Sequence, residues 1–351
     1  MGRTVMKTAI VTSDYHTPSE TFINRHIDLL FGGETCVIAG RANGQNPYNR
    51  AVFERRAGLR GLDFLAAPFG LLKNRIVYST SRVPFGSRKV AFKAWLQAEK
   101  VEVILAEFGT QAIAVAPIAH EVSLPVFSYF RGTDASKALR TGNVVAAYRK
   151  AIPNLDGIFA VSQFLLDNLA AKGVTHPNAH VIPSGVNVRL FKPGQKRRKS
   201  CLTVGRMVPK KAPLTTIRAF GQAAKAHSDA QLTMIGDGPL LGKAKALVQD
   251  LGIGAQVSFL GAQDHESVRI AMQSHEIFLQ HSVTADDGNT EGLPTAIQEA
   301  MAAGCVVVST RHAGIPEAVD DRETGYLVGE HDEQGFADRI GDVLSSTETA
   351  A

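Results

Sequence analysis

The chain has 351 residues, of which 44% are hydrophobic and 20% charged, and its net charge is +5. This length suits two α/β domains of roughly 170 residues each, and the composition is that of a globular protein rather than a disordered or fibrous one. No stretch approaches the ~20 uninterrupted apolar residues that a membrane-spanning helix requires.

The first half of the chain alternates apolar, strand-like runs with helical stretches. Strands are predicted at residues 8–12, 34–39, 101–106, 125–130, 157–161 and 180–182, and the clearest helices at residues 21–30, 111–121 and 163–172. Strands separated by helices of 10–15 residues indicate right-handed βαβ units. We therefore expect a parallel sheet that is covered by helices on both faces.

The second half repeats this pattern. Strands are predicted at residues 201–204, 231–235, 256–260, 276–279 and 306–309, and helices at 212–226, 239–251, 265–273, 294–303 and 333–344. A polar segment with Pro193 and Gly194 separates the two blocks. We predict an N-terminal domain (1–188), a linker (189–199) and a C-terminal domain (200–351), with two Rossmann-like doubly wound sheets facing across a cleft. Ligands of such sheets bind at the carboxyl ends of the strands.

Basic residues are concentrated in one part of the first half. The stretch that begins at Arg41 and ends at Lys100 contains 12 Lys/Arg against 3 Asp/Glu, an excess of +9. Such a segment attracts anions, so peripheral contact with an anionic membrane or a phosphorylated substrate is one interpretation and a solvated surface is the other. Residues 82–96 interleave aromatic and basic side chains, which fits an interfacial helix, with a core-facing helix as the alternative. The stretch lacks a nucleic-acid recognition motif, so we expect no nucleic-acid partner.

The three cysteines, Cys36, Cys201 and Cys305, lie in or beside apolar runs and are widely separated. We expect buried, reduced thiols and no zinc site, as is usual for a cytoplasmic protein. The first twelve residues read as a strand rather than a signal peptide. We expect a cytoplasmic location, with the inner face of the cell membrane as the alternative.

A helix start in the second half has the features of an anion site. Gly292 permits a tight turn, and Pro294 fits the first position of a helix that ends before Gly304. The free N–H groups at such a start point towards an anion, and the helix dipole favours its charge. These N–H groups belong to Leu293, Thr295 and Ala296.

Two glutamates flank this helix start. Glu291 lies in the loop before the helix, and Glu299 lies eight residues further on. A carboxylate beside a phosphate site is unsuited to binding the phosphate, but it can accept hydrogen bonds from sugar hydroxyls.

Basic side chains follow directly on the first strand of the second block. Arg206, Lys210 and Lys211 lie at its carboxyl end, and a glycine-rich turn that begins at Gly236 follows the next strand. Arginine offers a planar fork to phosphate oxygens and lysine a point charge, so together they can neutralise a diphosphate without a metal. No two aspartates lie two residues apart, so the Asp-x-Asp motif of metal-dependent transferases is absent from the sequence.

Taken in order, these motifs resemble those of a known family. From residue 181 to residue 328 the chain resembles the catalytic half of family-4 glycosyltransferases of the GT-B fold. The matching stretches are VIPSGVN (181–187), VGRMVPKK (204–211), IGDGPL (235–240), VSFLG (257–261), EGLP (291–294), QEAMAAG (298–304), GIPE (314–317) and TGYLV (324–328).

The resemblance implies a retaining, metal-independent transfer from a UDP- or GDP-sugar, with no other cofactor. It assigns the diphosphate to Arg206 and Lys211, a hydroxyl of the donor sugar to Glu291 and the ribose to Glu299. In a front-face transfer the departing phosphate oxygen accepts the proton of the acceptor. The remaining donor-binding positions that it implies are Gly236, Gly238, Phe259, Gly261, Gly292, Leu293 and Thr295.

The N-terminal block resembles a subgroup of the family involved in exopolysaccharide, capsule or O-antigen assembly, which implies a polysaccharide or lipid-linked glycan as acceptor. The residues that carry this resemblance form the loop TPSETFI (17–23), which borders the phosphates in relatives. Ser19 and Thr21 each offer a hydroxyl there. The alternative is that Ser19 caps the first helix.

Two positions depart from the family pattern. Relatives carry His-Gly-x-Asp where this chain has Arg131 to Asp134, and often a histidine where it has Glu107. Arg131 either contacts the sugar or phosphate, or pairs with Glu107 or Asp134 as scaffolding. Relatives also continue past the last predicted helix with a segment that crosses back to the first domain, so we expect a short crossover or a truncated chain end.

Two other functions were weighed. A catalytically inert homologue that binds a nucleotide sugar in a glycan assembly complex fits the substitution at Arg131. A nicotinamide-dependent oxidoreductase does not fit, because the turn from Gly236 to Gly242 lacks the Gly-x-Gly-x-x-Gly spacing.

Overall fold

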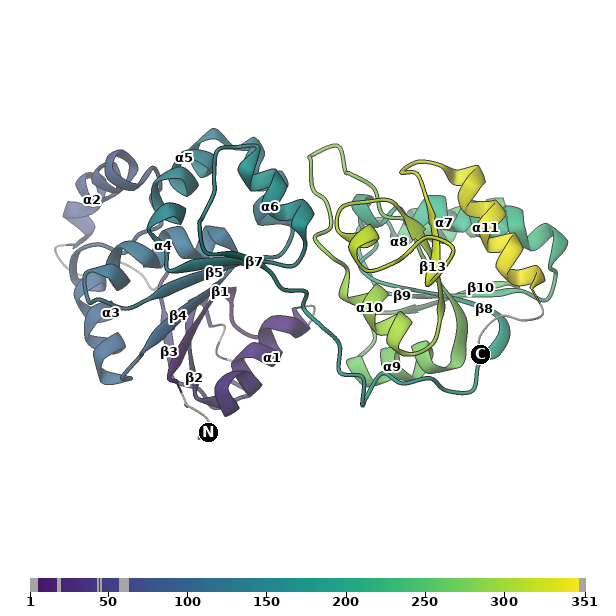
Figure 1. Cartoon of the computed structure of the whole chain (residues 1–351), viewed down its shortest axis with the longest axis horizontal. Helices are drawn as coiled ribbons and strands as arrows, with labels where there is room; N and C mark the ends of the chain where they lie inside the picture. Colours follow the sequence, from purple (N-terminus) through teal and green to yellow (C-terminus); the bar gives the residue numbers. More distant parts are fainter. Residues whose placement is uncertain (1–5, 18–19, 43, 45, 57–62, 347–351) are drawn as a thin grey trace. The chain divides into compact units, whose positions relative to one another are not determined.

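The computed structural model describes residues 6–17, 20–42, 44, 46–56 and 63–346. The chain divides into two compact units, Met1–Ile182 and Pro183–Ala351 (Figure 1). The division falls before the predicted domain end at residue 188. The first strand of unit 2, β8, also starts at Arg197, inside the predicted linker, because Arg197 pairs with His275, the first residue of the neighbouring strand β11.

Unit 1 is built on a parallel sheet of seven strands in the order β3-β2-β1-β4-β5-β6-β7. Its strands are β1 (Thr8–Asp14), β2 (Thr35–Arg41), β3 (Val52–Glu54), β4 (Val103–Glu107), β5 (Val126–Phe130), β6 (Gly157–Ala160) and β7 (Ala179–Val181). Its helices are α1 (Thr21–Leu29), α2 (Asp63–Tyr78), α3 (Gly86–Ala98), α4 (Gly109–His120), α5 (Gly142–Ala151) and α6 (Gln163–Ala170). Strand β4 is fully buried and β1 is buried from Thr8 to Thr12, as expected for a sheet covered on both faces.

Unit 2 is built on a parallel sheet of six strands in the order β10-β9-β8-β11-β12-β13. Its strands are β8 (Arg197–Val204), β9 (Gln231–Ile235), β10 (Val257–Gly261), β11 (His275–Gln280), β12 (Val306–Thr310) and β13 (Gly325–Val328). Its helices are α7 (Pro213–Ala223), α8 (Leu241–Asp250), α9 (His265–Ser274), α10 (Thr295–Ala302) and α11 (Glu333–Ser345).

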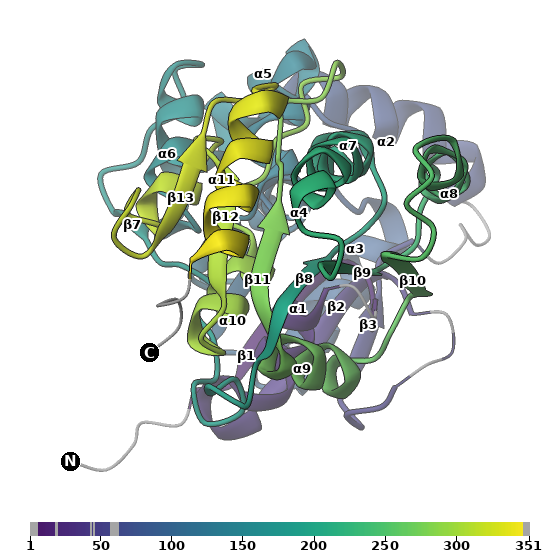
Figure 2. The ribbon, with the colours of Figure 1, turned by 90° about the vertical axis from the view of Figure 1, so that its right-hand side faces the viewer.

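Alternating strand residues of unit 2 supply two separate cores. Ile277 and Leu279 pack with α7, α8 and α11 on one face of the sheet, while Phe278 packs with α9 and α10 on the other (Figures 1 and 2). This alternation follows from the period of two along a strand. The prediction of two Rossmann-like parallel sheets is confirmed.

Of the two interpretations of residues 82–96, an interfacial helix and a core-facing helix, the structure shows the core-facing one. In α3, Phe92 and Leu96 are buried, and Phe92 and Trp95 pack against Phe53 of β3 at ring distances of 4.9 and 5.6 Å. Aromatic side chains that pack against one another bury their apolar surface, so this face of α3 belongs to the core of unit 1.

The three cysteines are free and buried, as predicted. Burial raises the pKa of the Cys36 thiol to about 12. Among the helices of the described residues, none is both long enough and apolar enough to cross a bilayer.

Candidate functional site

Two glycine-containing loops meet at the carboxyl ends of β8 and β9. The Gly205 N–H donates to the Ile235 carbonyl at 3.0 Å. Gly236 has a φ of +138°, and a Cβ there would lie 1.9 Å from the Gly205 carbonyl oxygen. Gly238 has a φ of +152°, and its Cβ would lie 2.6 Å from the carbonyl oxygen of Met207. Both predicted donor-site glycines therefore let two backbones approach where no other residue fits.

A cluster of charged side chains lies beside these loops. Lys210 and Lys211 place their ammonium nitrogens 3.5 and 3.4 Å from the same carboxylate oxygen, Oε1 of Glu291. Lys210 follows β8 in sequence and Glu291 precedes α10, so two strand-end loops bring the charges together. Lys210 also donates to the Thr290 carbonyl at 3.0 Å, which fixes it to the Glu291 loop.

The cluster is largely removed from solvent. The Glu291 side chain is 10% exposed and the Lys211 side chain 18%. Burial opposes ionisation of Glu291, but the charges of Lys211 and Lys210 outweigh it and lower the pKa to about 2. Burial lowers the pKa of Lys211, while the Glu291 charge opposes that shift. We therefore treat the cluster as an ionised carboxylate held between two ammonium groups.

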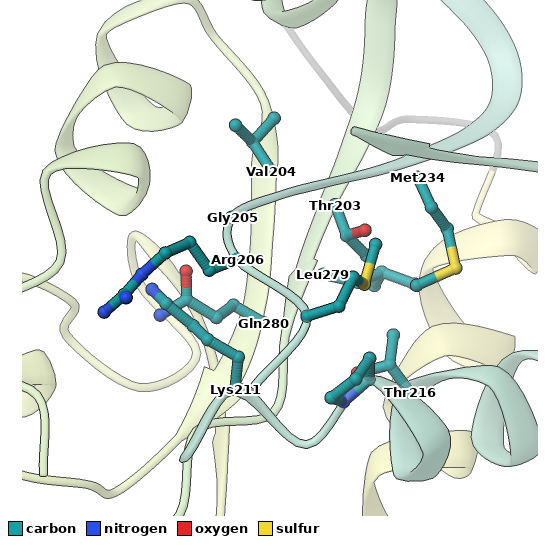
Figure 3. Close-up of a pocket in the computed structure, with 11 residues that line it drawn as sticks. Thr203, Val204, Gly205, Arg206, Lys211, Thr216, Met234, Leu279 and Gln280 are labelled. Carbon is teal, nitrogen blue, oxygen red and sulfur yellow. The ribbon is translucent and has the colours of Figure 1, made fainter. Parts of the chain in front are cut away.

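Arg206 is the exposed member of the group. Figure 3 shows the Arg206 and Lys211 side chains extending to the same side, beside Gln280 at the end of β11. The pocket that they line has a volume of about 20 Å³, room for about one water molecule. It is too small to enclose a nucleotide.

The start of α10 presents free backbone N–H groups. Pro294 occupies the N-cap position with extended backbone, so it lies one residue before the first helical position that the sequence predicts for it. The N–H groups of Leu293, Thr295 and Ala296 donate to no acceptor within the part of the chain that the structure describes. They remain available to an anion, whose charge the helix dipole favours.

A histidine that the sequence analysis missed fixes the Glu291 loop. His312, buried beyond the end of β12, accepts a hydrogen bond through Nε2 from the Glu291 N–H at 3.0 Å. Its Nδ1 lies 2.7 Å from Glu330 Oε1. Because Nε2 accepts, Nδ1 carries the proton and donates to Glu330. Its position two residues after a strand was the only signal in the sequence.

The other predicted donor-site residues lie on α10, at the end of β10 and in the loop before α10. Glu299 on α10 lies 3.4 Å from Nε2 of His265 on α9, and its side chain is 12% exposed. Gly261 accepts from the Gly236 N–H at 2.8 Å, and Gly292 accepts from the Gly314 N–H at 2.9 Å. The Phe259 side chain is partly buried and packs against the core.

Two of the predicted acceptor-side residues, Glu107 and Arg131, form a buried ion pair in unit 1. Arg131 donates from Nε and Nη2 to Oε2 of Glu107 at 3.0 and 2.8 Å. Nδ1 of His26 lies 2.6 Å from the other Glu107 oxygen. The Arg131 guanidinium carbon also lies 3.5 Å from the Tyr129 ring centroid. Burial opposes ionisation of Glu107, but Arg131 and His26 outweigh it, and its pKa is lowered.

Asp134 has a different role from its neighbours. Its carboxylate accepts hydrogen bonds from the backbone N–H groups of Gly109, Arg131 and Gly132 at 2.9–3.1 Å. Burial raises its pKa despite these donors. Asp134 thus binds the Arg131 backbone rather than its guanidinium, and of the two alternatives for Arg131 the structure shows the pairing with Glu107.

The first helix, α1, begins at Thr21 with Glu20 at its N-cap, and the Glu20 side chain makes no capping hydrogen bond. Thr21 is exposed. Ser19, the predicted cap, lies outside the described residues.

Comparisons with known proteins agree with this architecture. The family described as "Glycosyltransferase Family 4" matches residues 37–190, and the one described as "Glycosyl transferases group 1" matches residues 189–351. The chain is 27% identical over 247 residues to the putative colanic acid biosynthesis glycosyltransferase WcaL of Escherichia coli strain K12, covering 69% of this chain and 61% of that protein. It is 28% identical over 266 residues to the amylovoran biosynthesis glycosyltransferase AmsK of Erwinia amylovora, covering 72% and 64%.

A solved structure with the same fold is that of Anabaena HepE in complex with UDP. It superposes with a TM-score of 0.75 at 16% identity, covering 98% of this chain and 91% of that one. At this identity the likeness shows the fold alone. Together with the two adjacent family matches, the strand order and the strand-end loops establish that the chain belongs to the group 1 and family 4 glycosyltransferases of the GT-B fold.

Proposed function

We propose that the chain transfers a sugar, with retention of anomeric configuration, from a UDP- or GDP-sugar to a polysaccharide or lipid-linked glycan. The observation that carries the proposal is the grouping of Arg206, Lys211 and Glu291 beside the open start of α10. The names of the relatives, which refer to colanic acid and amylovoran biosynthesis, support the class of acceptor. HepE, whose structure contains UDP, supports a uridine nucleotide.

In this proposal, unit 2 stabilises the leaving group. As the bond between the anomeric carbon and the phosphate oxygen breaks, negative charge develops on the β-phosphate. Arg206, Lys211 and the free N–H groups at the start of α10 meet that charge without rearranging, which is how preorganised sites lower a barrier. The protein itself supplies the positive charge, so the proposed transfer needs no metal.

The acceptor oxygen forms its bond on the face that the phosphate leaves. The acceptor's proton passes to the departing phosphate oxygen, so the step balances without a protein base. Glu291 is held ionised by Lys210 and Lys211 and is suited to accept hydrogen bonds from the donor sugar rather than to carry this proton. The His312 contact holds its loop in register with α10.

Turnover with a panel of UDP- and GDP-sugars tests the proposal, with release of nucleoside diphosphate as the measurement and a lipid-linked glycan fraction as acceptor. We expect Arg206→Ala and Lys211→Ala each to lower kcat by roughly 10²-fold, the scale of losing one preorganised donor. The matched control is Lys243→Ala, on the exposed side of α8. Rates of the two variants within a few-fold of the control would contradict the assignment. NMR of the new anomeric centre tests retention.

The same experiment separates the enzyme from an inert homologue. The buried Arg131–Glu107 pair, at a position where relatives carry a histidine, is the observation that favours the second. An inert homologue would be stabilised by its nucleotide sugar in a thermal-shift assay, yet it would release no nucleoside diphosphate with any donor.

A membrane contact is also part of the proposal, and α2 supports it. Leu65, Phe69, Leu72 and Ile76 are 74%, 76%, 57% and 67% exposed, and their spacing places them on one face of the helix. The exposed cations Lys73 and Arg75 lie on the same helix. An apolar stripe with adjacent cations suits the surface of an anionic bilayer.

Co-sedimentation with vesicles tests this contact. We expect binding to vesicles that contain phosphatidylglycerol, weaker binding at high salt, and loss of binding in Phe69→Ser/Leu72→Ser. Equal binding of this variant and of Leu251→Ser, an exposed leucine of unit 2, would contradict the role of α2.

A further inference from the structure

A cavity in unit 1, separate from the pocket beside Lys211 in unit 2, is lined by arginines. It has a volume of about 270 Å³, close to the lower end of the range for small-molecule sites. Its residues come from the segment after β3, the connection between α2 and α3, the first turn of α3 and the first turn of α4. They are Arg55, Arg56, Ser81, Arg82, Val83, Pro84, Phe85, Arg88 and Gln111. Four of the nine are arginines and none is acidic.

Three arginines of the cavity, Arg55, Arg56 and Arg82, are not neutralised within the part of unit 1 that the structure describes. No ion pair joins Arg55, Arg56 or Arg82 to a carboxylate of the described residues. The charges of Arg56 and Arg82 reach Arg55, where burial first and these charges second lower the pKa to about 10. Like charges gathered without a counter-ion repel one another, and a bound anion would remove that repulsion.

Arg55 is held in place by polar partners. It is 9% exposed, and its Nη2 donates to the Thr12 carbonyl at 3.4 Å and to the side-chain oxygen of Gln111. Gln111 in turn donates to the Ser13 hydroxyl at 2.6 Å. Nε of Arg55 is buried and donates to no acceptor. A fixed, buried guanidinium with an unused donor is the mark of a built site rather than of a solvated surface.

The cavity also lies where the fold binds ligands. Thr12 and Ser13 lie near the end of β1, Arg55 follows the last residue of β3, and Gln111 lies in the first turn of α4, so all mark the carboxyl edge of the sheet. Arg82 donates from Nη1 to the Thr110 carbonyl at 3.3 Å, which ties the connection between α2 and α3 to the same edge.

We propose that this cavity binds a phosphate or diphosphate group carried by the acceptor. The inference rests on the proposed function, because it assigns the acceptor of that transfer a chemical class. Guanidinium forks match the oxygens of phosphate in pairs. Several guanidiniums around one cavity match a multiply charged phosphate group better than the single charge of a carboxylate. A glycan that is linked to a lipid through a diphosphate has this chemistry.

Inorganic pyrophosphate is the probe. It is titrated by calorimetry into an Arg206→Ala/Lys211→Ala double variant, in which the donor site is disabled. The titration is repeated with a triple variant that carries Arg82→Gln as well. Arg82 is exposed, so its substitution spares the core. We expect pyrophosphate to bind the double variant and its affinity to fall about tenfold or more with Arg82→Gln, the scale of one charge-assisted hydrogen bond. Arg75→Gln on α2 makes the same charge change outside the cavity and is the control.

Three results would overturn the proposal. They are no binding of pyrophosphate to the double variant, equal affinity in Arg82→Gln and Arg75→Gln, and tighter binding of glucuronate than of pyrophosphate. Arg55→Lys provides a second variant that keeps the charge but loses the fork, and it should also weaken pyrophosphate. Binding of UDP or GDP to unit 2 of the Arg82→Gln protein should equal wild type. Loss of the donor site would therefore be seen separately from loss of this one.

Discussion

Replacement of Glu291 by glutamine removes the one negative charge between Lys210 and Lys211. The ordinary pKa of this carboxyl is 4.5, and in the folded chain it is about 2. At about 1.36 kcal/mol per pH unit of difference, the ionised group contributes about 3 kcal/mol to the stability of unit 2 at pH 7. Its side chain is 10% exposed, so solvent screening takes little from this value. We expect Glu291→Gln to lower the unfolding free energy of unit 2 by about this amount.

The pH dependence has a definite sign. Because folding lowers the pKa, the stabilisation is complete above pH 4.5 and is lost as the pH falls towards about 2. At pH 3.5 the difference between wild type and Glu291→Gln should therefore shrink to about 2 kcal/mol.

Hydrogen exchange of unit 2 peptides in increasing urea measures this difference. Fluorescence of Trp95, the only tryptophan, reports on unit 1 and should not change. Glu333→Gln is the control, because its ion pair with Arg218 is about a third exposed and should contribute less than about 1 kcal/mol. A loss below about 0.5 kcal/mol for Glu291→Gln, or one that does not shrink in acid, would refute the reasoning.

Three further substitutions test neighbouring parts of the account. Gly236→Ala should destabilise unit 2 by more than about 2 kcal/mol, whereas Gly242→Ala, with nothing within 4 Å of its Cβ, should be neutral or slightly stabilising in the same urea assay. His312→Ala leaves the buried Glu291 N–H without an acceptor, so calorimetry should show weaker binding of UDP or GDP by about tenfold or more; unchanged affinity would contradict the positioning role. Glu107→Gln should lower the stability of unit 1 by about 3 kcal/mol, read by Trp95 fluorescence, because it leaves the Arg131 charge buried without a counter-charge; a stability equal to wild type would show that the pair is dispensable.

Local sequence patterns were sufficient to predict the two sheets. Strands such as β9, predicted and found at Gln231–Ile235, are apolar runs followed by helices of ordinary length. The loops after β8 and before α10 were found for the same reason, since strand ends and helix starts are local features. Strands β3 and β13, of three and four residues, were not among the predicted strands.

Contacts between distant residues could not be predicted in the same way. The bond between His312 and the Glu291 N–H spans 21 residues, and its partner Glu330 is a further 18 away. The pairing of Arg131 with Glu107 depends on which strand ends are neighbours in the sheet, since β4 and β5 lie side by side. The exposed face of α2 and the buried face of α3 have similar composition, so only the packing of Phe53 distinguishes the two helices.

The central claim is that unit 2 holds the diphosphate of a nucleotide sugar between Arg206, Lys211 and the start of α10. Calorimetric titration of UDP and GDP into wild type, Arg206→Ala, Lys211→Ala and Lys243→Ala tests it most directly. One of the two nucleotides should bind wild type and Lys243→Ala alike, and should bind the other two variants about tenfold or more weakly. Equal affinity in all four proteins, or no binding of either nucleotide to wild type, would contradict it.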